Sequence, residues 1–541
     1  MRPTRPPTPE RRAQHEATGA WPQPPLSTLL ADRAARTPDR VFVTESAGGR
    51  FTFAEVARRA ERLAVALQRL GVAAGDVVSW QVPNWACAAA LAAAIDRLGA
   101  ISNPIITIYR EQEVGFVCRQ TRSRVLVVPG VVRGVDHRAM ARAVQATTPS
   151  LEHVVTLRAE PLDGQRGLES LEADPATPLP PSPHGPHDVS AIFYTSGTTA
   201  DPKGVLHTPS TLGSVLHYHA EIFGTGGDDV SLLQFPLTHI GGLLMYVMLP
   251  IARGSHVVYM DGYDPALAVE LIERLGVTTA GGPPAILQGM FAAPSFTPEK
   301  VRTVKTSGSG AADVSPELMR QIQTRFGGDA FVYRSYGMTE CPMLSCGRRD
   351  DPTETLHGTD GRPVPGATAR LVDDAGNPVP PGTEGEILVF GPQLCVGYLD
   401  PALNAAFTAD GFYASGDLGV ADARGAIRIT GRRKDVIIRK GENLSAKSIE
   451  DDLAAHPKVA DVAVVGVPDA ASGERVCACV VLKPDAGGLT LAEVRAHMEA
   501  RGVMRQKIPE QLELLAELPR NATGKVRKDQ LRARLRDAAG A

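Results

Sequence analysis

Short apolar runs alternate with amphipathic helical stretches over residues 25–360 of this chain. Residues 125–128, which are all apolar, and residues 254–259, which end in Val-Val-Tyr, are strand candidates. Residues 265–275 have helical spacing and follow Asp264, a suitable N-cap, and an Ala-rich helix is expected over 86–95 with Asn84 as its cap. This alternation is typical of α/β layers with largely parallel sheets.

The pattern changes at residue 361. From there to residue 429, short alternating runs are separated by turns that contain Asp and Gly, which predicts an antiparallel β unit. Later runs predict helices near 448–455 and 491–501 and strands near 459–465 and 476–482. We therefore expect an α/β fold in three parts. These are a mobile N-terminal tail (1–24), a large domain (25–430) with a β-barrel-like subdomain (about 361–430), and a small mobile α+β domain (431–541).

Composition narrows the class of protein. The 541 residues are 43% hydrophobic, which is ample for a buried core, and the net charge of -3 gives no bulk field that would recruit nucleic acid or an acidic membrane. Seven scattered cysteines without metal-ligand spacing fit a reducing cytoplasm. Residues 1–20 lack the apolar core of a secretory signal, and the longest Ala-rich run is too short to cross a bilayer. A cytoplasmic protein with no transmembrane segment and no nucleic-acid partner is expected.

The densest chemical signal lies at residues 194–204, where four Ser/Thr hydroxyls, two glycines and one lysine follow an apolar run. Glycines allow tight turns, and successive N–H groups in such a turn attract anions, so this segment predicts a nucleotide phosphate loop. It differs from the G-x-x-x-x-G-K-[ST] pattern, because Lys203 precedes Gly204 and Val205 follows. A GTPase or a standard P-loop ATPase is therefore disfavoured.

Six further motifs follow in a fixed order: 236–239, 307–312, 336–340, 415–419, 431–435 and 518–525. With the phosphate loop, they make the chain resemble the adenylate-forming superfamily of acyl-CoA synthetases, adenylation domains and luciferases, over about residues 25–536. The resemblance implies a two-step ligase that uses ATP, Mg²⁺ and CoA. A carboxylate attacks the α-phosphorus of ATP to give an acyl-adenylate and pyrophosphate, and a thiol then displaces AMP while the small domain rotates.

The resemblance also assigns roles to residues. Lys525 would bridge the carboxylate and the α-phosphate, Thr339 would contact that phosphate, and His239 would form a wall of the acyl pocket and swing between the steps. Glu340 would be the magnesium ligand. The residues implied to bind nucleotide or CoA, or to serve the domain rotation, are Thr195, Ser196, Gly197, Thr198, Thr199, Lys203, Ser307, Gly308, Ser309, Tyr336, Gly337, Met338, Asp417, Arg432, Lys434 and Gly441. Among these, Tyr336 would cover adenine, Asp417 would hold the ribose hydroxyls, Lys434 would be the hinge, and Gly441 would line the CoA tunnel.

By the same resemblance, the acyl pocket is walled by His239, Met338 and residues 241–242, 281–284 and 307–311. No acid lies among them to pair an amino group, which argues against a free amino acid and favours an apolar carboxylic acid. The segments 81–85 and 359–363 resemble medium-chain and cyclohexanecarboxylate-type CoA ligases, and aryl acids remain possible. The alternatives are an adenylating ligase that loads a carrier protein, a nucleotide-binding regulator without activity, and a hydrolytic ATPase. The oligomeric state, monomer or homodimer, stays open.

Overall fold

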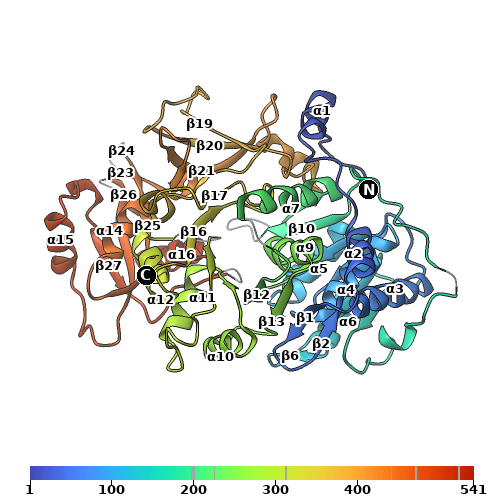
Figure 1. Ribbon diagram of the computed structural model, residues 1–541. Helices are drawn as coiled ribbons and strands as arrows, with labels where there is room; N and C mark the ends of the chain where they lie inside the picture. The colour runs from blue at the N-terminus through green and yellow to red at the C-terminus, as the bar shows by residue number, and fades with distance from the viewer. Residues whose placement is uncertain are drawn as a thin grey trace.

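The computed structural model describes residues 1–176, 178–195, 202–223, 226–310, 314–439, 442–469, 472–521 and 524–540. Two large sheets form the body of the molecule, and the C-terminal unit, orange to red, lies at one end (Figure 1). The seven-stranded sheet runs β11-β10-β4-β3-β5-β8-β9. Its strands are β3 (Val77–Trp80), β4 (Ile101–Pro104), β5 (Val125–Val128), β8 (His153–Thr156), β9 (Arg166–Gly167), β10 (Ala191–Thr195) and β11 (Lys203–His207). All neighbours are parallel except β10 and β11.

The second large sheet has nine strands in the order β18-β17-β16-β15-β14-β12-β13-β1-β2. They are β1 (Val41–Glu45), β2 (Arg50–Thr52), β12 (Val230–Leu233), β13 (His256–Tyr259), β14 (Thr279–Ala280), β15 (Thr306–Ser309), β16 (Phe331–Tyr336), β17 (Ser345–Cys346) and β18 (Arg362–Pro363). Its central strands, from β1 to β16, are parallel. The α/β expectation is confirmed.

Helices cover both sheets. In the large domain they are α2 (Leu26–Arg36), α3 (Phe53–Arg69), α4 (Ala86–Arg97), α5 (Glu111–Thr121), α6 (His137–Ala146), α7 (Pro209–Phe223), α8 (Ile240–Leu243), α9 (Leu249–Arg253), α10 (Pro265–Leu275), α11 (Pro284–Ala292), α12 (Pro316–Arg325) and α13 (Thr353–Gly358). A π-helical turn, η2 (Leu244–Met248), joins α8 to α9, and a small hairpin pairs β6 (Val131–Val132) with β7 (Val135–Asp136). Asp264 caps α10 as expected, accepting from the N–H groups of Ala266 and Leu267.

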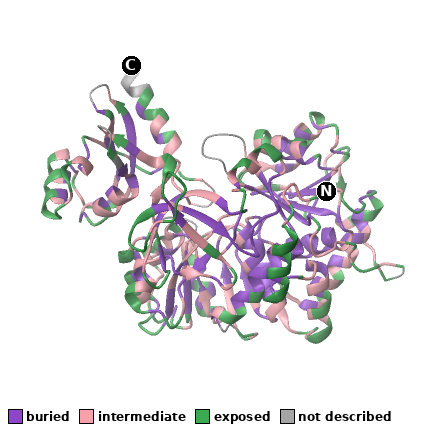
Figure 2. Ribbon diagram, turned by 90° about the horizontal axis from the view of Figure 1, so that it is seen from above, coloured by how far each residue is buried: buried purple, intermediate pink, exposed green. Residues whose placement is uncertain are grey.

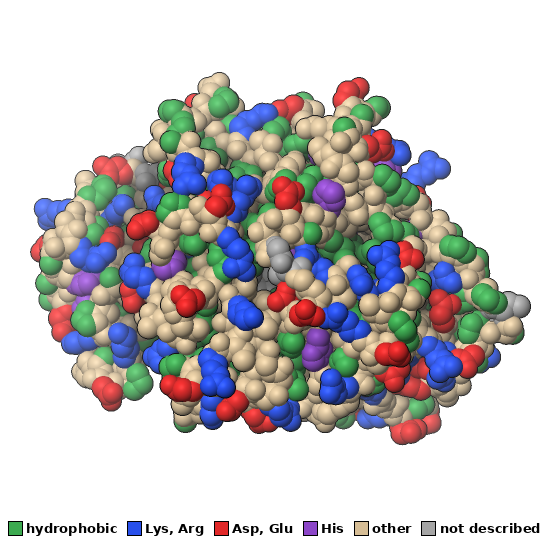
Figure 3. All heavy atoms as spheres, in the orientation of Figure 1, with side chains coloured by type: hydrophobic (Ala, Val, Ile, Leu, Met, Phe, Trp, Pro, Cys, Tyr) green, Lys and Arg blue, Asp and Glu red, His purple; other side chains and the backbone are tan. Residues whose placement is uncertain are grey.

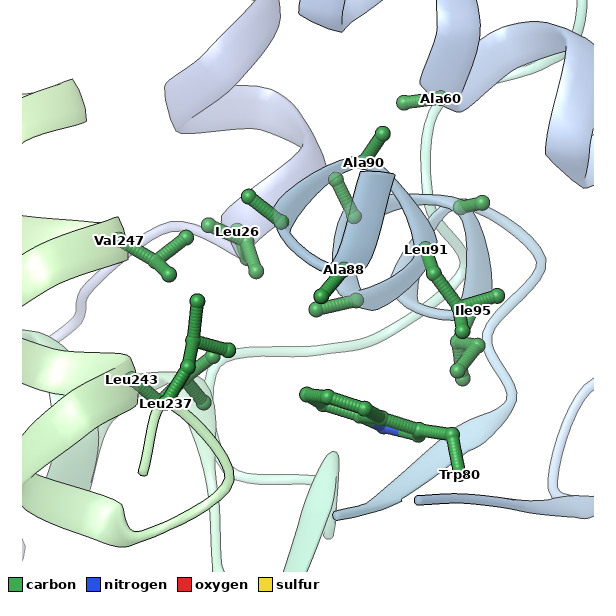
Figure 4. Packing of buried hydrophobic residues seen from close by; sticks show 14 of the residues in the cluster. Leu26, Ala60, Trp80, Ala88, Ala90, Leu91, Ile95, Leu237, Leu243 and Val247 are labelled. Carbon is green, nitrogen blue, oxygen red and sulfur yellow. The ribbon is translucent and has the colours of Figure 1, made fainter. Parts of the chain in front are cut away.

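Helix α4 fills the space between the other helices and the sheet. Every residue from Ala86 to Asp96 is buried, and the small alanines allow α2 and α3 to approach closely. Figure 4 shows Trp80 lying under this helix, with Leu237 and Leu243 beside it. The indole N–H of Trp80 donates to Ser102 Oγ at 2.9 Å, so the ring is buried without an unsatisfied donor.

The expected cap of α4 was wrong. Asn84 instead donates to the carbonyls of Phe235 (3.1 Å) and Met260 (2.8 Å) and accepts from Leu237 N (2.7 Å). The N–H of Ala86 donates to a glutamate, Glu45, from a neighbouring strand. Asn84 thereby supports the segment 235–237, which leads directly into His239.

The antiparallel unit over 361–430 is confirmed as a four-stranded sheet in linear order, β19 (Thr368–Val372), β20 (Glu384–Phe390), β21 (Tyr413–Ala421) and β22 (Ile427–Arg432). The C-terminal unit contains β23 (Val436–Arg439), β24 (Glu442–Ser445), β25 (Val459–Asp469), β26 (Gly473–Leu482), β27 (Gln511–Leu514), α14 (Ala446–Ala454), α15 (Leu491–Ala500) and α16 (Lys528–Gly540). It has its own buried core, and Figure 2 shows it as a separate body beside the large domain.

The N-terminal segment is not the mobile tail that composition suggested. Thr8 caps a helix, α1 (Pro9–Ala17), and the N–H of Arg5 donates to Val396 O at 2.9 Å. The indole N–H of Trp21 donates to Pro392 O at 3.1 Å, and Trp21 is 4% exposed. Residues 1–24 therefore form a strap across the segment that follows β20. Contacts of Arg5 and Trp21 hold this strap in place although it is rich in polar residues.

Candidate active site

The sequence-predicted site residues gather where strands of both large sheets end. Thr195 ends β10 and pairs with Lys203 at the start of β11, so the predicted phosphate loop joins two antiparallel strands. Ser307–Ser309 lie at the end of β15 and Tyr336 ends β16. The carboxyl ends of parallel strands are the usual position of ligand sites in α/β sheets.

Asp417 is the centre of a buried polar group. Its carboxylate is 3% exposed, accepts a 2.8 Å ion pair from Arg432 Nε on Oδ1, and accepts the Tyr336 hydroxyl at 2.7 Å on Oδ2. The register of β21 and β22 places Arg432 directly opposite Asp417. Burial and the Asp417 charge raise the pKa of Tyr336 well above its usual range, so this phenol remains a donor. Each carboxylate oxygen retains a lone pair that can accept a further hydrogen bond.

Glu340 lies in a second buried polar group, and it is 7% exposed. Tyr398 donates to Oε1 at 2.6 Å, and the Tyr413 hydroxyl lies 3.3 Å from the same oxygen and 2.8 Å from the Tyr398 hydroxyl. Burial and the Glu340 charge raise the pKa of both phenols. A single carboxylate fits Mg²⁺, which takes one or two protein carboxylates and completes its shell with water and phosphate oxygens. The described residues contain no cluster of three or more His, Cys, Asp or Glu side chains arranged to hold a metal.

Thr339 is held through its backbone. Its carbonyl accepts from His207 Nε2 at 2.8 Å, and His207 Nδ1 lies 3.0 Å from the Thr211 hydroxyl. Burial lowers the pKa of His207 to about 4, so the ring is neutral with its proton on Nε2. Sequence reasoning missed His207, although it lies only four residues after Lys203.

His239 caps helix α8, accepting from Gly241 N at 3.2 Å on Nδ1. Burial, together with the ammonium of Lys525, lowers its pKa to about 4, so this imidazole is neutral. A small, mostly apolar cavity lies against it, lined by Pro104, Ile105, Ile106, Tyr109, Val117, Phe193, Tyr194, Thr238, His239, Ile240 and Thr339. His239 therefore forms part of the wall of this cavity.

Lys525 is delivered from the small domain. It follows Gly524, whose φ of +82° forms the turn, and its N–H donates to Asn521 Oδ1 at 2.9 Å. Burial between the domains and the nearby Arg432 cation lower the pKa of Lys525 to about 8, while Asp417 and Glu340 oppose this shift. Lys525 thus lies within electrostatic range of both buried carboxylates.

Glycines of the predicted acyl pocket and of the predicted nucleotide site are required by protein packing. A Cβ on Gly281 would lie 2.4 Å from Gly308 O, and one on Gly308 would lie 2.7 Å from the end of the Tyr333 ring. A Cβ on Gly337 would meet Met343 N at 2.5 Å. These contacts bring β14, β15 and β16 together so closely that the backbone itself forms the wall. Ser307 Oγ is buried without a hydrogen-bond partner in the described structure, and Ser309 Oγ donates to Gly282 O at 3.0 Å.

The predicted hinge lies between two anchors. Arg433 pairs with Glu386 (2.6 Å) and Asp374 (3.0 Å) of the large domain, whereas Asp435 accepts from Arg532 of α16 at 2.6 Å. Lys434 is exposed between them, in the 3₁₀ turn η4 (Arg433–Asp435). Ser196, Gly197, Thr198, Thr199 and Gly441 lie outside the described residues.

The face of the molecule in Figure 3 carries basic and acidic side chains interspersed, without a large patch of one sign. Within the described ranges, no helix is both long and apolar enough to cross a membrane.

Comparison with known proteins agrees with this geometry. Residues 30–399 match the model of the AMP-binding enzyme family, and residues 448–525 match that of the AMP-binding enzyme C-terminal domain. The medium-chain fatty-acid–CoA ligase of Escherichia coli (strain K12) is 30% identical over 97% of this chain and 92% of its own length. The salicyl-AMP ligase / salicyl-S-ArCP synthetase of Mycobacterium tuberculosis is 33% identical over 98% and 94%. ATP-bound MatB from Rhodopseudomonas palustris superimposes with a TM-score of 0.84 at 29% identity, covering 95% of this chain and 99% of that one.

Proposed function

Because this chain belongs to the AMP-binding enzyme family, we propose that it joins an apolar carboxylic acid to the thiol of CoA through an acyl-adenylate. Membership makes it an ATP-dependent, AMP-forming ligase. The observation that carries the finer proposal is the position of Lys525, which brings a cation from the small domain into the cleft of Asp417 and Glu340.

In the proposed first step, a carboxylate oxygen of the acid bonds to the α-phosphorus of ATP and the bond to pyrophosphate breaks. Two anions must approach, so positive charge that is already in place lowers the barrier. Lys525 supplies that charge, Asp417 orients the ribose, and Tyr336 supports the adenine. A magnesium ion bound at Glu340 would neutralise phosphate charge.

In the proposed second step, the thiol loses its proton and bonds to the acyl carbon, and AMP leaves. The small domain must first withdraw Lys525, and the two anchors beside Lys434 support rotation at that residue. His239 is neutral and borders the small cavity, and its ring is proposed to turn aside to admit the thiol. Gly441 is proposed to line the route of the pantetheine arm.

The nature of the acid follows from the wall of the pocket. Phe235 lies against Gly241 and Gly282, with ring atoms 3.9 Å from a Cβ built on either glycine, and Tyr246 packs edge-on against Phe235 at 5.3 Å. A wall of aromatic rings and bare backbone favours a ring or an alkyl chain, and it offers no carboxylate to an ammonium group. We therefore propose a medium-chain, alicyclic or aryl acid.

A carrier-protein thiol is the second candidate. The relative named salicyl-AMP ligase / salicyl-S-ArCP synthetase covers 98% of this chain, so the whole architecture is shared with an enzyme whose name includes a carrier product. The chemistry of the cleft is the same for either thiol, and the choice depends on the outer surface of the tunnel.

A panel of carboxylates tests the proposal, with pyrophosphate release and thioester formation measured separately. We expect an apolar acid to release pyrophosphate, and CoA to give the thioester faster than a phosphopantetheinylated aryl carrier protein. Faster loading of the carrier would favour the second candidate. Formation of ADP and phosphate, or no pyrophosphate with any acid, would contradict both.

A further inference from the structure

The carboxylate of Glu340 is fixed by two phenols from outside the motif that supplies it. The hydroxyls of Tyr398 and Tyr413 lie 2.6 Å and 3.3 Å from Glu340 Oε1, and the two hydroxyls are 2.8 Å apart. The consistent arrangement is a relay in which Tyr413 donates to Tyr398 and Tyr398 donates to Glu340. Because neither phenol occupies Oε2, that oxygen is available for a cation.

The segment that carries Tyr398 is itself braced. Its N–H donates to Asn404 Oδ1 at 3.0 Å, and its carbonyl accepts from the Thr4 hydroxyl at 2.7 Å. Asn404 Nδ2 donates to the same Thr4 hydroxyl at 3.2 Å. Arg5 adds a guanidinium stacked over the ring of Phe407 at 4.6 Å. The N-terminal strap thus holds the backbone on both sides of the phenol.

We propose that Tyr398 and Tyr413 are positioning residues for the cation-binding carboxylate Glu340, and that Thr4 of the N-terminal strap keeps Tyr398 in place. This inference rests on the proposed function, which makes Glu340 the magnesium ligand. A carboxylate with free rotation must lose conformational entropy when it binds a metal, whereas one already held by hydrogen bonds does not. The phenols therefore act through Glu340 and need not touch the substrate.

The test is Mn²⁺ binding to the full-length protein with a non-cleavable ATP analogue, followed by electron paramagnetic resonance of the free ion. Tyr398→Phe should weaken Mn²⁺ binding about tenfold, the lower end of the cost of removing an outer-shell partner. Tyr413→Phe, which removes the longer contact, and Thr4→Val should weaken it less. Affinity for the analogue without metal should be unchanged in all three.

Tyr259→Phe is the matched control, since Tyr259 is a fully buried tyrosine whose hydroxyl donates to Tyr246 O at 2.8 Å, away from Glu340. It should leave Mn²⁺ binding at the parent value. If Glu340→Gln weakens Mn²⁺ binding and neither tyrosine variant does, the positioning role is wrong while the metal assignment stands. If Glu340→Gln has no effect, the metal assignment within the proposed function fails. If Tyr398→Phe does not fold, Tyr413→Phe and Thr4→Val decide the outcome.

Discussion

Arg432 and Asp417 face each other across neighbouring strands of the four-stranded sheet, and Arg432 Nε lies 2.8 Å from Asp417 Oδ1. The pair is placed by strand register, so its geometry does not depend on a flexible loop. It also lies next to the hinge, because Arg432 is the last residue of β22 and Lys434 follows two residues later.

Arg432→Ala should raise the KM for ATP, measured by pyrophosphate release, about 10- to 100-fold. The substitution leaves the Asp417 carboxylate without its charged partner, and loss of a hydrogen bond to a charged group costs ~1.5–3 kcal/mol. Arg432→Lys should recover part of the loss, since an ammonium restores charge without the guanidinium geometry. Arg428→Ala, an exposed position on the same strand, is the control. An Arg432→Ala variant with parental KM would show that the pair is only structural.

If Lys525 supplies the positive charge for adenylation, as proposed, that step should depend on pH. Its pKa is lowered to about 8, so the ammonium is present below pH 8 and is lost as the pH rises through that value. We expect kcat/KM for pyrophosphate release to fall above pH 8. Lys525→Arg should remove this fall, because a guanidinium stays charged. An unchanged fall in the arginine variant would assign the titration to another group.

The loss of activity above pH 8 should not be unfolding. Because the folded-state pKa of Lys525 lies below the unfolded value, the unfolded chain binds more protons between about pH 8 and 10.5. The contribution of Lys525 to the free energy of unfolding therefore rises with pH in that window, whereas the rate of pyrophosphate release is expected to fall. Chemical denaturation of the parent and of Lys525→Arg at both ends of the window measures that contribution.

The anchors at 433 and 435 predict where rotation occurs. Lys434→Pro should slow thioester formation from supplied acyl-adenylate and CoA much more than pyrophosphate release, because proline restricts φ between two anchored residues. Lys434→Ala removes the same side chain without restricting the backbone, and it should spare both steps. Equal losses in both half-reactions of the proline variant would reject the hinge.

Helices and strands of this fold were predictable from the sequence, because capping residues and the spacing of apolar residues act over only a few positions of the chain. The cap Asp264 specifies α10 within four residues, and the alternating pattern at 361–430 specifies antiparallel strands. Cys477 and Cys479 are two residues apart on β26 and both are buried, as the alternation of side chains along a strand requires. The strand β10 (Ala191–Thr195) continues beyond the apolar run into the predicted phosphate loop, because pairing with β11 extends it.

Long-range partners were not predictable from these patterns. Tyr398 lies 58 residues from Glu340, and Thr4 lies 394 residues from Tyr398. Nothing in either local sequence distinguishes a bracing threonine from a solvent-exposed one. Asn84 was misassigned for the same reason. A side-chain amide before a helix suggests a cap, and only the fold reveals its three better partners, two in the segment before His239 and one at Met260.

The close approach of β14 and β15 predicts a graded response to added methyl groups. Gly281→Ala would place its Cβ 2.4 Å from the backbone oxygen of Gly308, which cannot move without displacing the strand. Gly308→Ala would instead meet the Tyr333 ring at 2.7 Å, and a ring end can shift. Both alanine variants should lose about 1–3 kcal/mol of stability, as overpacked cores do, and the loss should be larger for Gly281→Ala.

The measurement is the midpoint of thermal unfolding, with Gly358→Ala as control because nothing lies within 4 Å of a Cβ there. Gly308→Ala combined with Tyr333→Leu should regain stability relative to Gly308→Ala alone, since the shorter side chain leaves room for the methyl. The same shortening should not rescue Gly281→Ala, whose obstacle is backbone. Rescue of both by Tyr333→Leu would mean that the ring, and not the strand spacing, limits this wall of the pocket.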